Sequence, residues 1–148
     1  MEKRQNYSRK RESILQAICS TDIHPTADWI YQHLKPVYPD LSLGTVYRNI
    51  AKFKEDGVVV SVGVVKGQER LDGNTIPHPH FICNVCGRVI DLNAVELAPA
   101  ISRQVSKSYP YQIDYCDLIF HGRCDKCQEE NQHRPAGEIP GGAEPGTG

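Results

Sequence analysis

Long apolar runs are missing from this chain of 148 residues. No stretch approaches the roughly 20 consecutive apolar residues that a membrane-spanning helix needs, which argues against a membrane protein. The first residues, MEKRQNYSRKRES, carry charges but have no apolar run behind them, so they lack the pattern of a secretory signal peptide. We therefore expect a cytoplasmic protein without a membrane partner.

An excess of positive charge is missing as well. The formal net charge is −1, which argues against a uniformly basic nucleic-acid-binding protein. Basic residues are nevertheless concentrated at the start of the chain: Lys3, Arg4, Arg9, Lys10 and Arg11. A local basic arm can contact phosphate even on a near-neutral protein, with Arg9 and Arg11 as candidate contacts. A solvated start to a first helix explains the same charges equally well.

Three segments with helical periodicity precede residue 58. They cover residues 8–20, a segment that follows Thr26 as N-cap, and a segment between Ser42 as N-cap and Gly57 as terminator. A β-branched stretch follows, with Lys66-Gly67 where a hairpin would turn. Three short helices and a hairpin are the order of a winged helix-turn-helix, whose third helix enters the DNA major groove.

The third helix would present Tyr47 and Arg48 to DNA. Arg48 can reach phosphate or guanine, and Tyr47 can pack against a base methyl group or bond to phosphate. Tyr47 also fits the apolar stripe of its helix, so a structural role for this side chain stays open.

A polar joint that contains Gly and Pro divides the chain at GNTIP. We expect a DNA-binding domain at 1–72, a hinge at 73–77 and a second domain at 78–130. Within the second domain the pattern predicts strands at 80–83 and 88–92, a helix at 97–107 with Pro99 in its first turn, and a strand at 111–120. The Gly- and Pro-rich tail at 131–148 is expected to be disordered.

Two Cys-x-x-Cys pairs stand near the two ends of the predicted second domain, Cys83 with Cys86 and Cys124 with Cys127. Each pair can clasp one edge of a tetrahedral ion, and the closed S₄ set suits Zn²⁺ or a single iron. A dithiol redox pair and two chance pairs are the alternatives, but in a reducing compartment matched pairs favour metal. We expect a structural zinc, because so small a domain has little core of its own. Cys19, on an apolar helix face, is expected to be a core residue.

A second set of potential ligands lies around the first cysteine pair. His78 and His80 are two residues apart, and alternate residues of a strand point to the same side, so they can present two imidazoles to one ion. An exposed polar pair is the plainer interpretation of His-x-His alone. Three further residues favour a metal site: Asp72 before the joint, Asp91 after the first cysteine pair, and His24.

Three imidazoles and two carboxylates form a mixed N/O shell that suits Fe²⁺, Mn²⁺ or Zn²⁺ and leaves room for a small ligand. Because the five residues belong to both predicted domains, a bound metal would lock the orientation of one domain relative to the other. A small metalloenzyme could use such an open site. No residue beyond the ligands stands out as a general acid or base, however, so we expect a regulator without an organic cofactor rather than an enzyme.

The segments HPTADWIYQHL, SLGTVYRNIAKF, HPHFICNVCGRVIDL and GRCDKC together resemble the ferric uptake regulator family of metal-dependent bacterial repressors, over about residues 8–130. The resemblance implies an α+β fold with an N-terminal winged-helix DNA-binding domain and a C-terminal α/β dimerisation domain that holds a Cys₄ zinc. It also implies a regulatory Fe²⁺ or Mn²⁺ at the hinge. A homodimer of this kind binds a pseudo-palindromic double-stranded DNA operator.

Within the family, the five residues resemble the regulatory site of the peroxide-stress repressors. In those proteins Fe²⁺ reacts with hydrogen peroxide, a ligand histidine is oxidised, the metal is lost and DNA is released; Mn²⁺ holds the same shape but reacts poorly. The resemblance makes His24 and His78 the candidate oxidation targets. The position of Asp72 is usually Glu in iron-uptake members, so Asp72 favours the peroxide sensor over the alternative, an iron- or zinc-uptake repressor.

The chain departs from the family pattern at three places. YSRKR stands where the family often has TPQR, so we expect the contacts of the N-terminal arm with DNA to differ from those of the family. Cys116 and His121 stand where uptake members with an additional metal site often have His and Tyr. Cys116 is a ligand of an altered site, a redox-sensitive thiol or a plain strand residue, and the last interpretation is favoured.

Overall fold

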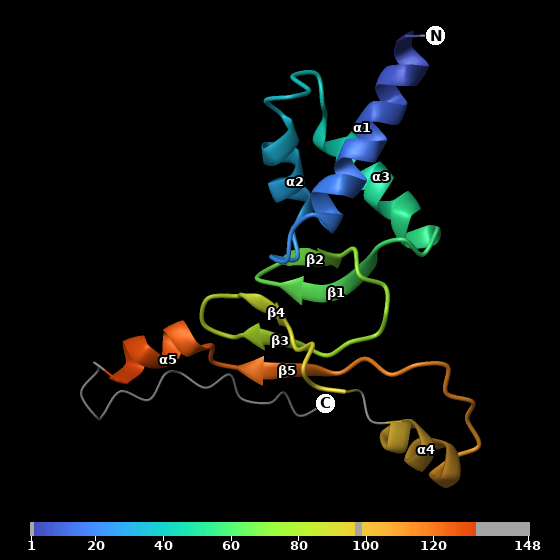
Figure 1. Ribbon diagram of the computed structural model, residues 1–148, viewed down its shortest axis with the longest axis vertical. Helices are drawn as coiled ribbons and strands as arrows, with labels where there is room; N and C mark the ends of the chain where they lie inside the picture. Colours follow the sequence, from blue (N-terminus) through green and yellow to red (C-terminus); the bar gives the residue numbers. More distant parts are fainter. Residues whose placement is uncertain (1, 97–98, 133–148) are drawn as a thin grey trace.

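The computed structural model of the chain describes residues 2–96 and 99–132. Its elements are, in order, α1 (Glu2–Cys19), α2 (Ala27–Leu34), α3 (Leu43–Glu55), β1 (Val60–Val65), β2 (Gln68–Asp72), β3 (His80–Cys83), β4 (Val89–Asp91), α4 (Pro99–Ser108), β5 (Ile119–Gly122) and α5 (Asp125–Gln132). Figure 1 shows them in three layers: the helices α1 to α3, the β1–β2 hairpin below them, and the sheet of β3, β4 and β5 below the hairpin. The fold is α+β, as predicted.

The ends of the second and third helices are determined by local capping, as the sequence predicts. Thr26 and Ser42 accept hydrogen bonds from the N–H groups of Trp29 and Thr45, both at 3.1 Å, and so satisfy donors that a helix leaves free in its first turn. Gly57 follows the last turn of α3 with φ of 74°, a left-handed conformation that glycine adopts without steric cost.

The core of the N-terminal half lies between the three helices and the hairpin. Its fully buried side chains include Ile14, Ile18, Ile30, Val46, Phe53 and Leu71. The apolar face predicted for α3 points into this core, except for Tyr47, which is 53% exposed. The helix α1 begins at Glu2, six residues before the predicted start. Its first turns bury no side chain, so they carry no apolar period that could have marked them.

The hairpin lies between the helices and the C-terminal sheet and packs against both. Lys66 and Gly67 turn it with φ of 51° and 78°, the two left-handed residues of a type I′ turn. Leu71 packs in the helical core, whereas Val62 packs with Ile82 and Val89 of the sheet. The two halves of the chain are therefore joined by a hairpin that contributes to both apolar cores.

In the sheet, β3 is the central strand, antiparallel to β4 and parallel to β5. The antiparallel register places His80 opposite Asp91. Since parallel strands end at the same edge of a sheet, the end of β3 and the end of β5 lie together. This edge carries both cysteine pairs.

Several sequence expectations are wrong in detail. The strand predicted at 111–120 is formed only from residue 119, because β5 bonds to β3 alone and β3 offers a ladder of four residues; the preceding alternation has no neighbouring strand in the described chain. The helix α5 after Cys124 was not predicted. Cys19 is exposed rather than in the core, because the face of α1 that packs in the core is formed by Ile14, Ala17 and Ile18. Of the tail at 131–148, residues 131–132 are helical, and the rest lies outside the described residues.

Pro99 begins α4, as predicted, and residues 97–98 lie outside the described part of the chain. The helix buries none of its side chains within the single chain, and Figure 1 shows it apart from the sheet. Among the described residues, no helix combines the length and the apolar character that a membrane crossing requires.

Phe53 provides a test of the helical core. It is 2% exposed, so Phe53→Ala should lower the free energy of unfolding by about 3–5 kcal/mol, through lost apolar burial and the cavity left behind. Tyr7→Ala, at a 57% exposed position of α1, should change it by less than about 0.5 kcal/mol. Urea unfolding of the metal-loaded variants measures both values, and equal losses would show that the core is wrongly placed.

Candidate metal centres

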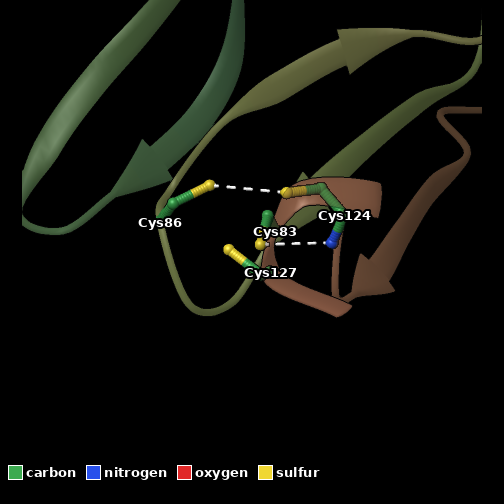
Figure 2. A group of neighbouring side chains, drawn as sticks. All are labelled: Cys83, Cys86, Cys124 and Cys127. Carbon is green, nitrogen blue, oxygen red and sulfur yellow. Dashed lines mark hydrogen bonds between the residues drawn. The ribbon is translucent and has the colours of Figure 1, made fainter. Parts of the chain in front are cut away.

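The four cysteines of the two Cys-x-x-Cys pairs converge at the edge where β3 and β5 end (Figure 2). Cys83 is the last residue of β3 and Cys86 lies in the turn after it, whereas Cys124 and Cys127 lie at the start of α5. The four sulfur atoms all lie within 4.8 Å of one another. Two segments far apart in sequence therefore present one compact S₄ group.

The size of this group fits a tetrahedral ion. With metal–sulfur bonds of about 2.3 Å, two sulfurs on one edge of a tetrahedron lie about 3.8 Å apart. The Sγ atoms of Cys86 and Cys124 are 3.8 Å apart. The donor set and its spacing therefore fit Zn²⁺ held by all four cysteines.

The electrostatics of the group also fit a cation. Burial would raise the pKa of Cys83, but backbone N–H groups that point at its sulfur, including that of Cys124 at 3.3 Å, lower its pKa to about 6. Desolvation and the three neighbouring sulfurs raise the pKa of Cys127 to about 12. Thiols gathered this closely resist becoming thiolates together, unless a divalent cation balances their charge.

The turn between the first two cysteines depends on Gly87. Its φ is 74°, and its N–H donates to the carbonyl oxygen of Cys83 at 2.9 Å, which closes the knuckle. A Cβ at this position would lie 3.2 Å from Cε of Lys66 in the hairpin turn. Glycine is therefore required here both for its conformation and for the close approach of the hairpin.

The second cluster consists of His24, Asp72, His78, His80 and Asp91, whose ligand atoms all lie within 4.8 Å of one another. His24 lies in the loop before α2, and Asp72 ends β2. His80 begins β3 opposite Asp91, the last residue of β4. The structure thus brings together all five residues singled out in the sequence, from the helical half, the hairpin and the sheet.

The three imidazoles face the same two oxygen atoms. The Nε2 atoms of His24, His78 and His80 lie 2.8, 2.8 and 3.0 Å from Oδ1 of Asp91. The same nitrogens lie 3.3, 3.0 and 3.0 Å from Oδ2 of Asp72. Around an ion with bonds of about 2.1 Å, neighbouring ligands at right angles lie about 3.0 Å apart. The five atoms are therefore spaced like the vertices of one coordination shell.

The protonation state of His78 supports the same conclusion. Its Nδ1 lies 2.7 Å from the carbonyl oxygen of Ile76, which only accepts hydrogen bonds, so Nδ1 carries a hydrogen. In the neutral ring, Nε2 then has a lone pair, and this lone pair faces two carboxylates. A cation between them turns this repulsion into coordination; otherwise the ring must be protonated.

The pKa directions in this cluster follow from the same geometry. Burial alone would raise the pKa of Asp72, but contacts with His24 and His80, and the N–H of Asn74 at 2.8 Å, hold it well below its usual range. Burial alone would lower the pKa of His24 and of His78, yet hydrogen bonds and the two carboxylates raise both. Two carboxylates and one divalent cation make a site without net charge, which suits a buried position.

His24 is held unusually. It is 2% exposed, and its φ of 55° lies in the left-handed region, which costs about 1–3 kcal/mol for a residue other than glycine. Its Nδ1 is buried without a hydrogen-bond partner among the described residues. Metal-ligating histidines usually donate this second nitrogen to a partner that orients the ring. The position of His24 must therefore be determined by its backbone.

The sequence did not single out Arg70, which provides that backbone support. Its guanidinium donates to the carbonyl oxygens of Ile23 and His24, and also to that of Gly87. The available signal was the alternation of β2, which puts Arg70 on the same face of the strand as Asp72.

The residues predicted to contact DNA occupy different environments. Tyr47 and Arg48 are exposed on α3, opposite the face that packs in the core, and Arg9 is exposed on α1. Arg11 is engaged within the fold, over the ring of Phe53 at 4.6 Å and 3.3 Å from Asp56. The role of all four in DNA binding stays a prediction, and the contacts of Arg11 give it a structural function as well.

Cys116 and His121 lie outside both clusters. No third group of three or more potential ligands occurs within residues 2–96 and 99–132. His121 is exposed on β5, and Sγ of Cys116 lies 3.6 Å from the backbone oxygen of its neighbour Asp117. Cys116 precedes β5, so it is not the strand residue that was favoured.

Replacing one cysteine of the S₄ group should abolish metal retention. We expect Cys124→Ser to lose the single zinc of the purified wild-type chain, because a three-sulfur shell is open to water and to chelators. Cys116→Ser, which removes a thiol outside the group, should retain it. Zinc released by acid or thiol modification, quantified with a colorimetric chelator, gives the stoichiometry; full retention by Cys124→Ser would contradict the assignment.

Comparisons with known proteins agree with this architecture. The sequence profile of the Ferric uptake regulator family matches residues 2–129. The peroxide-responsive repressor PerR of Staphylococcus aureus (strain USA300) is 34% identical over 121 residues, which cover 82% of this chain and 81% of that protein. The Vibrio cholerae ferric uptake regulator has a TM-score of 0.61 at 26% identity, with coverage of 78% and 88%. That of Helicobacter pylori, with a TM-score of 0.69 at 21% identity and coverage of 81% and 80%, shows the fold alone. The chain belongs to the ferric uptake regulator family of metal-responsive repressors.

Proposed function

We propose that this protein is a metal-dependent transcriptional repressor that senses hydrogen peroxide through oxidation of its own histidine ligands. The observation that carries the proposal is the five-residue cluster of three imidazoles and two aspartates at the junction of the two halves. The 34% identity to a peroxide-responsive repressor supports it further. The S₄ group would hold a structural Zn²⁺, since a closed tetrahedral shell leaves no position for chemistry.

The mixed shell suits Fe²⁺ or Mn²⁺ better than it suits a closed structural ion. Imidazole and carboxylate are ligands that both metals accept, and a shell of five donors would leave room for a small ligand. When bound there, Fe²⁺ would supply the electrons that reduce hydrogen peroxide, whereas Mn²⁺ would fill the same shell with little reaction. Reduction of hydrogen peroxide at this point would expose the surrounding imidazoles to oxidation first, and His24 and His78 are our candidate targets.

The position of the cluster connects oxidation to DNA release. His24 comes from the helical half, whereas His80 and Asp91 come from the sheet, so all five gather only when the two halves have the orientation seen here. An oxidised imidazole is a poorer ligand, and its loss frees the halves from each other. We therefore propose residues 1–72 as the DNA-binding domain, 73–77 as the hinge and 78–130 as the dimerisation domain.

The face that would contact DNA is the exposed side of α3. Ser42 and Thr45 lie at its first turn, and Arg48 donates to Oγ1 of Thr45 at 3.1 Å, so a guanidinium lies near the positive end of the helix dipole. The first turn holds no acidic residue. This combination suits phosphate, and Tyr47 on the same face is placed to reach base edges.

A homodimer would bury what the single chain leaves exposed. Ile101 of α4 and the tyrosines at 109, 111 and 115 are each at least 50% exposed, and no residue of α4 is buried by the described part of the chain. Apolar side chains gathered on one segment mark an interaction surface. A second copy of the chain is the partner we propose, which would give two α3 helices for two half-sites of a pseudo-palindromic operator.

The main alternative is an iron- or zinc-uptake repressor with the same site, which would respond to metal concentration. The distinguishing experiment compares DNA binding by the zinc-loaded protein with Mn²⁺ or Fe²⁺, before and after peroxide at a few micromolar. We expect only the Fe²⁺ form to release DNA. The peptide of His24 or His78 should then gain about 16 Da, the mass of one oxygen atom.

His33 serves as the internal control for that experiment. It is exposed on α2, where it stacks on Trp29, and it lies outside the cluster, so its peptide should keep its mass. If both metal forms keep DNA and binding merely follows metal concentration, the protein is an uptake regulator. Oxidation of His33 to the same degree would mean that peroxide acts from bulk solvent.

Removing Arg48 should weaken DNA binding. Arg48→Ala is expected to lose about 5–100-fold in affinity for a duplex selected from a random pool by the Mn²⁺-loaded protein. Arg88→Ala removes the same group from an exposed position that lies outside both α3 and the proposed dimer surface, and it should leave affinity within about twofold. Fluorescence anisotropy at two salt concentrations measures both, because a lost phosphate contact also lowers the salt dependence. Equal losses for the two variants would argue against α3 as the DNA-reading helix.

A further inference from the structure

Arg70 connects the two proposed metal sites through backbone carbonyl groups. Nη2 donates to the oxygen of Ile23 at 2.6 Å, Nε donates to that of His24, and Nη1 donates to that of Gly87 at 3.1 Å. Ile23 and His24 form the turn that carries one regulatory ligand. Gly87 closes the knuckle between the first two cysteines. The guanidinium of Arg70 therefore connects the knuckle of the cysteine site to the turn that carries His24, the most buried histidine of the other cluster.

The partners of Arg70 show that it is not an ordinary ion pair. Within residues 2–96 and 99–132, no carboxylate oxygen lies within 4.0 Å of its guanidinium nitrogens. Its side chain is half-buried in β2, and three of its donors are used on three carbonyls. A guanidinium has the rigid fork that this arrangement requires, whereas an ammonium is a single point with no fixed plane.

His24 needs such support more than the other histidines of the cluster. The ring of His78 is oriented by a hydrogen bond to the carbonyl of Ile76, whereas Nδ1 of His24 has no partner among the described residues. The left-handed φ of His24 is also one that a free chain rarely adopts. Both facts leave the backbone around His24 as the means by which the ring is kept in place: Arg70 holds the carbonyl groups of Ile23 and His24, and the N–H of Leu71 donates to that of Pro25 at 3.1 Å.

We propose that Arg70 is a positioning residue for the regulatory metal: it holds the turn of His24 against the cysteine knuckle and so pre-forms one vertex of the five-ligand shell. The inference rests on the proposed function of the five residues as a metal site. It adds to that function a residue that is not a ligand: metal binding at the five residues would depend on Arg70, although Arg70 does not contact the ion.

The first test is the affinity of the zinc-loaded, full-length protein for Mn²⁺, titrated by calorimetry or by the loss of free-Mn²⁺ electron paramagnetic resonance signal. Arg70→Gln should weaken Mn²⁺ binding about 10–100-fold, the usual effect of removing support from a metal-ligating histidine. Arg70→Lys keeps the charge but not the fork, so it should fall between Arg70→Gln and the wild type. Both variants should retain one zinc per chain, and both should bind DNA when Mn²⁺ is saturating.

Arg88→Gln is the matched control. Arg88 is also an arginine of the knuckle region, but its side chain is exposed. Within residues 2–96 and 99–132 its guanidinium bonds only to Asp125, next to the second cysteine pair, at 3.2 Å. Its replacement should leave Mn²⁺ affinity within about twofold. A loss equal to that of Arg70→Gln would overturn the proposal, because any disturbance of the knuckle would then have the same effect.

A double-mutant cycle separates positioning of His24 from a general loss of structure. If Arg70 acts through His24, the change Arg70→Gln should add little once His24→Ala has removed that ligand, yet it should keep its full effect when combined with Asp91→Asn. Equal effects in both backgrounds would overturn the proposal. The proposal would also be overturned if Arg70→Gln bound Mn²⁺ like the wild type while His24→Ala bound it more weakly. That result would leave the five-residue metal site itself supported. If His24→Ala and Asp91→Asn both bind Mn²⁺ like the wild type, the five-residue site itself fails.

Discussion

Two carboxylates that face one point determine the organisation of this molecule. The oxygens of Asp72 and Asp91 are each approached by three imidazole nitrogens at 2.8–3.3 Å, and these groups come from the helical half, the hairpin and the sheet. Buried negative charge is costly unless it is compensated, and here the compensation must come from a third party or from protonated rings. The orientation of the helical half on the sheet is therefore linked to the charge state of a few atoms.

The hairpin makes that linkage mechanical. Val62 packs with the sheet, Leu71 packs with the helices, and Asp72 follows directly in the cluster. Arg70 on the same strand reaches both the cysteine knuckle and the turn of His24. The five-residue strand β2 thus contributes Leu71 to the helical core and contacts both ligand clusters. A shift of the hairpin would therefore disturb the core and both clusters together.

Much of this arrangement could be predicted from the sequence, because it depends on local rules. Thr26 and Ser42 begin helices and Gly57 follows the end of one, for reasons that lie within four residues of each position. The two Cys-x-x-Cys pairs have few other uses at that spacing, whereas His78 and His80 indicated a metal site only together with the more distant His24, Asp72 and Asp91. Contacts that depend on the tertiary fold could not be predicted. The length of β5 is limited by the four residues of β3, and Arg70 bonds to backbone oxygens, which every residue possesses and no pattern distinguishes. The prediction that Cys19 lies in the core was wrong, because the sequence does not show which side of the last turn of α1 the rest of the fold covers.

The parallel pairing of β3 with β5 has a consequence for how the protein is made. The first cysteine pair is synthesised at the end of β3, but its partners follow only after α4 and β5. At translation rates of about 5–20 residues per second, the pair waits on the order of seconds for the second pair, while all core residues of the helical half, including Leu71 of the hairpin, are already available. During that interval two exposed thiols can bind other metals or oxidise. The topology that brings the four cysteines together also makes their group one of the last parts of the described fold to be completed during synthesis.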